Sequence, residues 1–277
     1  MKTGMLGNEL EVYKHTLILC ELSKRTQAKY VSDILSFETF CQLKQVICKE
    51  DVIAYKDMLM RKYKVSTTNS KIISLNRYFS WLNHNELKVM PIKVQRKSNL
   101  HNVMSLVEYQ EMKATCVRQN NERNYLLIST LGTTGIRVGE LAAITKEAVC
   151  AGYAIITHKG KSRHIFLPPQ LTKELLKHCK KQGIETGIIF FGVQRDRALH
   201  PSSVWKLLKR VAVSAGVNPA KVYPHSLRHM FAKTYMSHIG NVFELADLLG
   251  HSSIETTRIY AATSVEEKRK SIESLQL

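Results

Sequence analysis

Residues 225–260 read HSLRHMFAKTYMSHIGNVFELADLLGHSSIETTRIY and bring several reactive side chains into one short part of the 277-residue chain. Pro224 precedes this stretch, and proline suits the first turn of a helix, where an amide hydrogen would have no partner. In a helix that begins here, His225 and Arg228 lie three residues apart and share one face. Free amides and the helix dipole make this end of a helix favourable for an anion.

A second helical segment follows in the same stretch. Three leucines form an apolar stripe at helical spacing, Leu245, Leu248 and Leu249. Gly250 is suited to end that helix, and His251 comes next. Residues 252–255, SSIE, have the spacing of a capping box that opens another short helix, with Tyr260 near its end. We therefore predict that two helix starts bring together a guanidinium, two imidazoles and a phenol.

Each of these residues, taken alone, is more often structural than catalytic. A single histidine usually packs or caps, and a helical tyrosine such as Tyr260 is usually half-buried. His225 and His229 have the i, i+4 spacing of a helical metal site, but no acidic residue lies between them and no third ligand is evident. We therefore expect no metal and no other cofactor.

The whole string is more specific than its parts. His225-x-x-Arg228, Leu249-Gly250-His251 and Tyr260, in this order and spacing, resemble the C-terminal signature of the tyrosine recombinases, the phage-integrase family. That resemblance implies DNA cleavage through a 3′-phosphotyrosyl intermediate, followed by rejoining without ATP.

A second motif lies in residues 133–144, TTGIRVGELAAI. Gly135 permits close approach of the backbone to a ligand, and Glu140 can orient or cap locally. The stretch resembles the first-arginine motif of the same family, which makes Arg137 a candidate catalytic residue.

The periodicity then changes from helical to extended. Residues 153–157 and 163–167 read as two strands of a β-hairpin, with a basic turn at 158–162. The resemblance implies a catalytic lysine on this hairpin, which would protonate the leaving 5′ oxygen. Lys159 matches it, and Lys161 is the competing assignment. The fold class is accordingly mainly α with a small β-hairpin, an α+β catalytic domain.

The first 90 residues read as four helices with basic outer faces. Lys71 and Arg77 point outward in the fourth and are candidate DNA contacts. The order of residues in 26–40 and 69–82 resembles the SAM-like core-binding domain of the family. We predict a DNA-binding domain over 1–90, a basic linker over 91–105 and the catalytic domain over 106–277, the two halves forming a C-shaped clamp on DNA.

The charge balance agrees with a nucleic-acid partner. The chain has 41 Lys and Arg against 23 Asp and Glu, a net charge of +18. Residues 1–100 hold 17 basic and 9 acidic side chains and the remainder 24 and 14, so the excess is not confined to a tail. No apolar run reaches 18 residues, no signal peptide is apparent and six cysteines form no C-x-x-C pair. We expect no membrane partner and a cytoplasmic, nucleoid-associated protein encoded by a bacterium, phage or mobile element.

The resemblance also implies a division of labour at the phosphate. Arg137 and Arg228 would contact the non-bridging oxygens, since guanidinium groups stay charged and offer paired donors. Tyr260 would attack phosphorus, His225 would take its proton, and His251 would donate a hydrogen bond to the phosphate.

Further expectations concern DNA contacts and assembly. A helix over 202–215 corresponds to the family's major-groove helix, with Ser202, Ser203 and Lys206 as candidate contacts. The tail 264–277 would dock on a neighbouring protomer. The partners implied are double-stranded core sites with inverted-repeat half-sites, a homotetramer on synapsed DNA, a Holliday-junction intermediate and an accessory directionality factor. The alternatives are a type IB topoisomerase and a catalytically silent DNA-binding factor.

Overall fold

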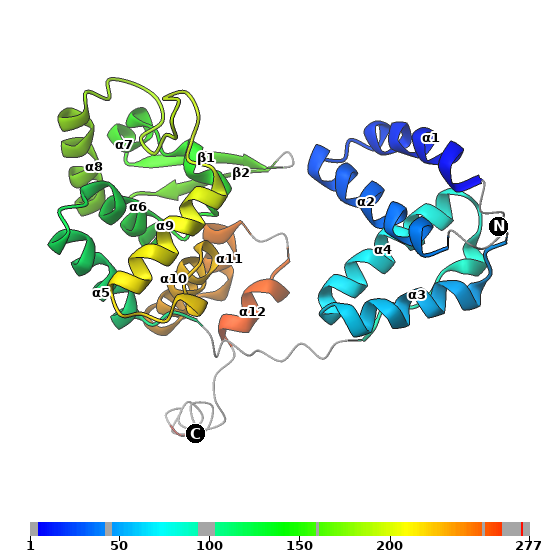
Figure 1. Ribbon diagram of the computed structural model, residues 1–277. Helices are drawn as coiled ribbons and strands as arrows, with labels where there is room; N and C mark the ends of the chain where they lie inside the picture. The colour runs from blue at the N-terminus through cyan, green and yellow to red at the C-terminus, as the bar shows by residue number, and fades with distance from the viewer. Residues whose placement is uncertain are drawn as a thin grey trace. The chain divides into compact units, whose positions relative to one another are not determined.

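The computed structural model describes residues 5–41, 46–93, 103–158, 161–250, 253–261 and 273. The chain divides into two compact units, Met1–Lys97 and Ser98–Leu277 (Figure 1). Each unit has a hydrophobic core of its own. The prediction of a mainly helical chain with a single small hairpin is confirmed for the described residues.

The first unit is a helical bundle, in line with the four helices predicted for the first 90 residues. Its helices are α1 (Met5–Leu19), α2 (Lys24–Phe40), α3 (Lys49–Lys62) and α4 (Val65–Trp81), with a 3-10 turn at Asn85–Leu87. Aromatic side chains fill the core, among them Tyr13, Phe37, Tyr55, Tyr78 and Phe79. Ser23 caps the start of α2, because its hydroxyl accepts a hydrogen bond from the Thr26 amide at 3.2 Å.

The outward position predicted for Lys71 is wrong. Its Nζ lies 3.0 Å from Oδ1 of Asp33, which is buried between α2 and α4, and Ser74 Oγ donates to the same carboxylate at 2.8 Å. A buried carboxylate needs a counter-charge and hydrogen bonds, and Lys71 turns inward to supply them. Arg77, by contrast, is exposed and lies over the Tyr30 ring.

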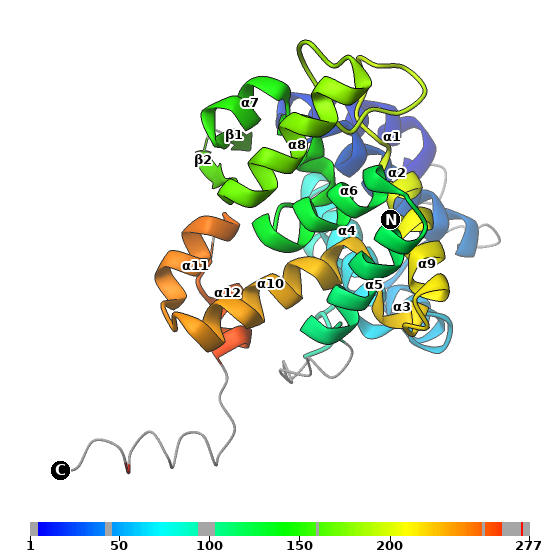
Figure 2. The same ribbon diagram turned by 90° about the vertical axis from the view of Figure 1, so that its left-hand side faces the viewer.

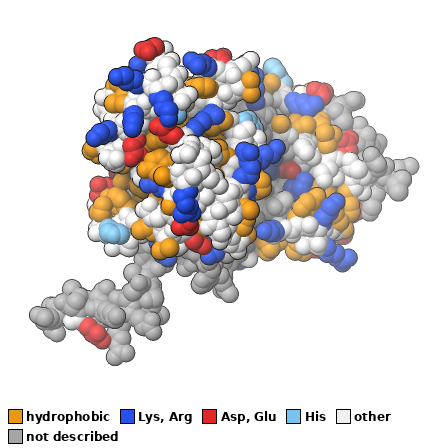
Figure 3. Space-filling view, turned by 60° about the vertical axis from the view of Figure 1, so that its left-hand side comes forward, with side chains coloured by type: hydrophobic (Ala, Val, Ile, Leu, Met, Phe, Trp, Pro, Cys, Tyr) orange, Lys and Arg blue, Asp and Glu red, His pale blue; other side chains and the backbone are white. Residues whose placement is uncertain are grey.

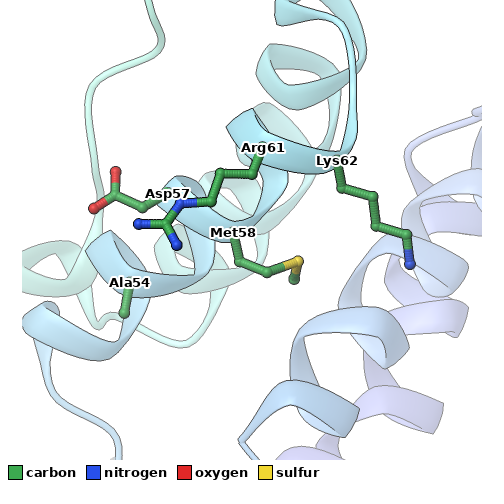
Figure 4. Close-up of a pocket in the computed structure, with 5 residues that line it drawn as sticks. All are labelled: Ala54, Asp57, Met58, Arg61 and Lys62. Atoms are coloured by element: carbon green, nitrogen blue, oxygen red, sulfur yellow. The ribbon is translucent and has the colours of Figure 1, made fainter.

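A surface hollow lies beside α3. It is lined by Ala54, Asp57, Met58, Arg61 and Lys62 (Figure 4). None of the residues predicted to be catalytic lies in it, and we assign it no part in the chemistry.

The second unit surrounds a larger core. Its N-terminal half contains α5 (Leu106–Arg118), α6 (Glu122–Thr134), a 3-10 helix (Val138–Ala143), α7 (Lys146–Ala151), β1 (Tyr153–His158) and β2 (Lys161–Phe166). Its C-terminal half contains α8 (Pro169–Gln182), α9 (Pro201–Ser214), a 3-10 turn (Pro219–Lys221), α10 (Pro224–His238), α11 (Val242–Leu249) and α12 (Glu255–Ala261). Helix α10 contacts α6, and α11 and α12 pack on α10 and on each other (Figure 2).

Strands β1 and β2 pair antiparallel, from Tyr153 opposite Phe166 to His158 opposite Lys161. We predicted a five-residue turn over 158–162. The strands instead pair as far as His158 and Lys161, so that only two residues separate them. A cross-strand pair explains the extension, because the hydroxyls of Thr157 and Ser162 are hydrogen-bonded at 2.8 Å.

Basic side chains are spread over the visible face among apolar and acidic ones (Figure 3). Among the described residues, no helix is long and apolar enough to span a membrane. Residues 94–102 of the predicted linker 91–105 lie outside the described residues. The same is true of the predicted tail 264–277, except for Glu273.

Candidate active site

The start of α10 places a buried arginine. Pro224 is the first helical residue, as predicted, and the Ser226 hydroxyl accepts from the Tyr223 amide at 3.0 Å. One turn further, Arg228 is only 4% exposed. Its guanidinium donates to the Gly135 carbonyl at 2.8 Å and to the Leu249 carbonyl at 2.6 Å. Burial and the charge of Arg137 lower the pKa of Arg228 to about 10, so this side chain remains a cation at neutral pH.

Arg137 approaches the same place from the end of α6. That helix ends at Gly135, whose φ of 61° is left-handed and whose missing Cβ makes room for Phe231. Arg137 then begins the 3-10 helix, and Glu140 accepts from its backbone amide at 2.7 Å and from its Nη1 at 3.0 Å. Arg137 Nη2 donates to the Gly250 carbonyl at 3.2 Å. Glu140 thus performs the local orienting role expected of it.

Three arginines from separate elements meet the C-terminal end of α11. Besides Arg228 at the Leu249 carbonyl and Arg137 at the Gly250 carbonyl, Arg163 of β2 donates from Nε to the Leu248 carbonyl at 3.3 Å. The last carbonyls of a helix lack intrahelical partners and carry partial negative charge, so they attract cations. The three contacts fix the position of the two arginines expected to bind phosphate.

Tyr260 lies on α12, close enough to Arg228 for the guanidinium charge to act on its phenol. It is 9% exposed, and its ring packs in a small cluster with Ala232, Leu245 and Leu249. Its hydroxyl is hydrogen-bonded to Nδ1 of His229. Burial raises the pKa of Tyr260 to about 12, although the charge of Arg228 acts in the opposite direction. The phenol is therefore neutral near pH 7 and needs an acceptor for its proton before it can attack.

Two histidines of α10 flank this phenol. The ring centroids of His225 and His229 are 6.3 Å apart, and that of His229 is 5.6 Å from Tyr260. Partial burial and the charges of Arg228 and Arg137 lower the pKa of His225. Burial, followed by the charges of His225 and Arg228, lowers the pKa of His229. Both imidazoles are neutral near pH 7, the form that accepts a proton.

Comparison with known proteins identifies the family. Residues 99–267 match the family model described as Phage integrase family. The chain belongs to this family of tyrosine recombinases. The resemblance carried by Arg137, Arg228 and Tyr260 is thereby confirmed at the level of the family.

Relatives and solved structures agree over most of the chain. The recombinase is 28% identical over 268 residues to the tyrosine recombinase of Pseudothermotoga lettingae, covering 92% of this chain and 93% of that protein. Its structure resembles a Tn1549 transposon integrase in complex with transposon right end DNA, with a TM-score of 0.76, 14% identity and full coverage of both chains. It also resembles a lambda integrase tetramer bound to a Holliday junction, with a TM-score of 0.73, 19% identity, and 93% and 77% coverage. At these identities the two structural likenesses show the fold.

Some predicted site residues of the recombinase lie outside the described residues. These are His251 and Lys159, and the side chain of the competing Lys161 is likewise not described, although its backbone begins β2. Within the described residues, no three His, Cys, Asp or Glu side chains form a group suited to a metal ion. Ser202, Ser203 and Lys206 are exposed along α9, where the sequence placed DNA contacts.

Sequence reasoning missed two residues at this site. It considered His229 only as a metal ligand, and it used Arg163 only as a strand residue and as the last residue of the K-G-x-x-R string that selects Lys159. A signal for Arg163 was present, because it lies two residues before the buried Ile165 and so shares the inward face of β2. A cation on a buried strand face requires a partner, which Glu140 supplies at 2.7 Å.

Proposed function

We propose that this recombinase cuts and rejoins DNA at specific sites, with Tyr260 as nucleophile and a Holliday junction as intermediate. The observation that carries the proposal is the convergence of Arg137, Arg228 and Tyr260 at the C-terminal end of α11. Two permanent cations beside a buried phenol suit attack on a phosphodiester, because charge grows on the non-bridging oxygens as the new bond forms.

The arginine donors have a clear use in this reaction. Arg228 donates to the Leu249 carbonyl at 2.6 Å and Arg137 to the Gly250 carbonyl at 3.2 Å. A scissile phosphate would accept from the same guanidinium groups, whose remaining N–H donors allow paired contacts. Electrostatic stabilisation of this kind contributes several kcal/mol, and a lost donor typically costs about 3 kcal/mol.

The remaining roles follow the family signature. The hydroxyl proton of Tyr260 passes to a histidine of α10, for which the sequence assigned His225. Lys159 protonates the 5′ oxygen that leaves, with Lys161 as the alternative donor. His251 donates a hydrogen bond to the phosphate. Rejoining reverses these proton transfers. The phosphotyrosyl bond conserves the energy of the phosphodiester bond that was cut, and rejoining therefore requires no ATP.

DNA is bound by both parts of the chain in this proposal. Residues 1–90 contact a core site, 106–277 carry the chemistry, and the linker 91–105 lets the halves close around the duplex as a C-shaped clamp. Arg77 and the exposed face of α9, with Ser202, Ser203 and Lys206, contact the DNA. Lys71 is removed from this set, because it pairs with Asp33.

The functional assembly is a homotetramer holding two sites with inverted-repeat half-sites. The tail 264–277 docks on the next protomer, and an accessory factor sets direction. The lambda integrase of similar fold, a tetramer bound to a Holliday junction, supports this arrangement by analogy. The cellular setting proposed is the cytoplasm of a bacterium, at the nucleoid, with a bacterial, phage or mobile-element gene.

A two-site plasmid assay tests the function. A plasmid carries two copies of the DNA that flanks the natural gene, and the junctions made by the protein are sequenced. Wild type should give precise recombinant joints, and Tyr260→Phe should give none. Relaxed plasmid without recombinant joints would instead indicate a topoisomerase, and no change in the DNA would indicate a silent DNA-binding factor.

A further inference from the structure

We propose that His229, and not His225, receives the proton of Tyr260 when this tyrosine attacks DNA. The inference deepens the proposed function and rests on Tyr260 being the nucleophile. Its basis is a direct contact, since Nδ1 of His229 is hydrogen-bonded to the hydroxyl oxygen of Tyr260. A general base must lie within hydrogen-bond reach of the proton it takes, and His229 meets that condition in this structure.

Packed helices fix this contact. His229 lies in the second turn of α10, and Tyr260 lies on α12, which contacts both α10 and α11. Tyr260 belongs to one buried apolar cluster with Leu245 and Leu249 of α11 and with Ala232, one turn beyond His229. The pair is therefore positioned by an apolar cluster on three helices rather than by a surface loop, which favours a reproducible geometry.

His225 is placed differently. It lies in the first turn of α10, exposed, with its ring centroid 6.3 Å from that of His229. The first turn of a helix offers free amides to an anion, and Arg228 follows on the same face. This position suits contact with the phosphate, and it leaves the proton of Tyr260 to the histidine one turn further along.

The protonation states agree with this direction of transfer. Burial and the charges of His225 and Arg228 lower the pKa of His229, which keeps the imidazole neutral. Burial raises the pKa of Tyr260 to about 12, Tyr223 acts in the same direction, and Arg228 opposes it. A neutral phenol beside a neutral imidazole donates its hydrogen to the unprotonated nitrogen, here Nδ1, which leaves Nε2 as the protonated ring nitrogen.

The step balances without any co-reactant. As Oη of Tyr260 forms its bond to phosphorus, the O–H bond breaks and the proton moves to Nδ1 of His229. The bond from phosphorus to the 5′ oxygen breaks, and that oxygen takes a proton from the general acid. During rejoining, the 5′ hydroxyl displaces the tyrosine, and the imidazolium of His229 returns its proton to the phenol oxygen.

The test is single-turnover cleavage of a nicked suicide substrate by the full chain, measured from pH 5 to pH 10. General-base catalysis contributes about 100- to 10,000-fold, so His229→Gln should cleave at least about 100-fold more slowly at pH 7. Its rate should rise with pH, because hydroxide then takes the proton. The wild-type rate should stay level from pH 7 down to about 6.5, the ordinary pKa of histidine, and fall only below it.

Two control variants separate base catalysis from other effects. His238→Gln changes an exposed histidine of the same helix, whose Nδ1 contacts the Thr234 carbonyl, and should leave the rate unchanged. His225→Gln should lower the rate but keep the wild-type pH profile. Melting temperature and single-site gel shifts confirm that each variant folds and binds, and His229→Asn serves if His229→Gln does not fold.

A rescue experiment excludes a merely structural role for His229. Incorporation of 3,5-difluorotyrosine at position 260 gives a more acidic phenol, which needs no base and should restore most of the rate of His229→Gln. The proposal is overturned if His229→Gln cleaves as fast as wild type, or if it is slow at every pH and is not rescued. An adduct that persists in Tyr260→Phe would instead contradict the nucleophile assignment, so the two failures are distinguishable.

Discussion

Arg163 and Glu140 form an almost buried ion pair behind the arginines expected to bind phosphate. Arg163 Nη2 lies 2.7 Å from Oε2 of Glu140, and the side chains are 13% and 12% exposed. The same carboxylate accepts from Arg137 at both its backbone amide and its guanidinium. Glu140 therefore connects strand β2 to Arg137 and fixes where that guanidinium lies.

Removal of this ion pair should damage both stability and cleavage. Arg163→Ala leaves a buried carboxylate with one partner fewer, and the loss of one member of a buried pair costs about 3–5 kcal/mol. We expect a clearly lower melting temperature and slower cleavage by the folded protein. The matched control is Arg118→Ala, which breaks the exposed pair with Glu111 and should cost under about 1 kcal/mol. Equal melting temperatures for the two variants would contradict this prediction.

The same carboxylate predicts an acid-sensitive contribution to stability. Burial alone would raise the pKa of Glu140, but its hydrogen bonds to Arg163 and Arg137 and the charge of Arg163 hold it below the ordinary value of 4.5. A lowered pKa means that the contribution is complete above pH 4.5 and is lost as the pH falls through the lower, folded value. The difference in unfolding free energy between wild type and Glu140→Gln should therefore shrink below pH 4.5. A difference in unfolding free energy that stays constant from pH 7 to pH 3 would contradict this prediction.

The turn that carries Arg137 should require glycine at its start. A Cβ on Gly135 would lie 2.5 Å from Cδ1 of Phe231 at a φ of 61°. Gly152 ends α7 at a φ of 79° with no atom within 4 Å of its Cβ position, so Gly152→Ala bears only the backbone strain, about 1–2 kcal/mol. Gly135→Ala should lose more stability than this control and more cleavage activity. Chemical denaturation of both variants measures the loss of stability. An equal loss of unfolding free energy in Gly135→Ala and Gly152→Ala would disprove the packing argument.

Cleavage should not depend on divalent metal. Arg137 and Arg228 already bring two permanent positive charges to the site, and the hairpin lysine is expected to protonate the leaving group. Adduct formation should proceed at the same rate in EDTA as in magnesium. Activity that disappears in EDTA and returns with magnesium would show that the arginines do not suffice.

The general acid can be assigned by changing the leaving group. Lys159→Ala should regain cleavage on a substrate whose bridging 5′ oxygen is replaced by sulfur, because a thiolate leaves without a proton. Arg137→Ala should not regain it, since charge on the non-bridging oxygens still needs stabilisation. Rescue of Lys161→Ala alone would move the role to Lys161.

Local signals in the sequence predicted the parts of the site that depend on neighbouring residues. Pro224 at the start of α10, Gly250 in a left-handed conformation at the end of α11 and the β-hairpin all follow from residue preferences over a few positions. Arg137 and Tyr260 were found because their motifs resemble a family, which periodicity alone could not have provided.

Contacts between distant segments were not predictable in the same way. His229 and Tyr260 are 31 residues apart, and only the packing of α12 on α10 decides which histidine faces the phenol. Lys71 was expected outside because its helix position appeared polar, whereas Asp33 on another helix attracts it inward. In both cases the side chain contacts a residue of another helix, which the periodicity of its own helix does not predict.

The assignment of Tyr260 as nucleophile requires that this residue become covalently joined to DNA. Mass spectrometry of the protein–DNA adduct trapped on a nicked suicide substrate, after digestion of the protein and the DNA, measures this bond itself. We predict a nucleotide attached through a 3′-phosphate to the peptide that contains Tyr260, and no such peptide from Tyr260→Phe. A nucleotide on any other residue, or an equal yield of adduct from Tyr260→Phe, would contradict the assignment.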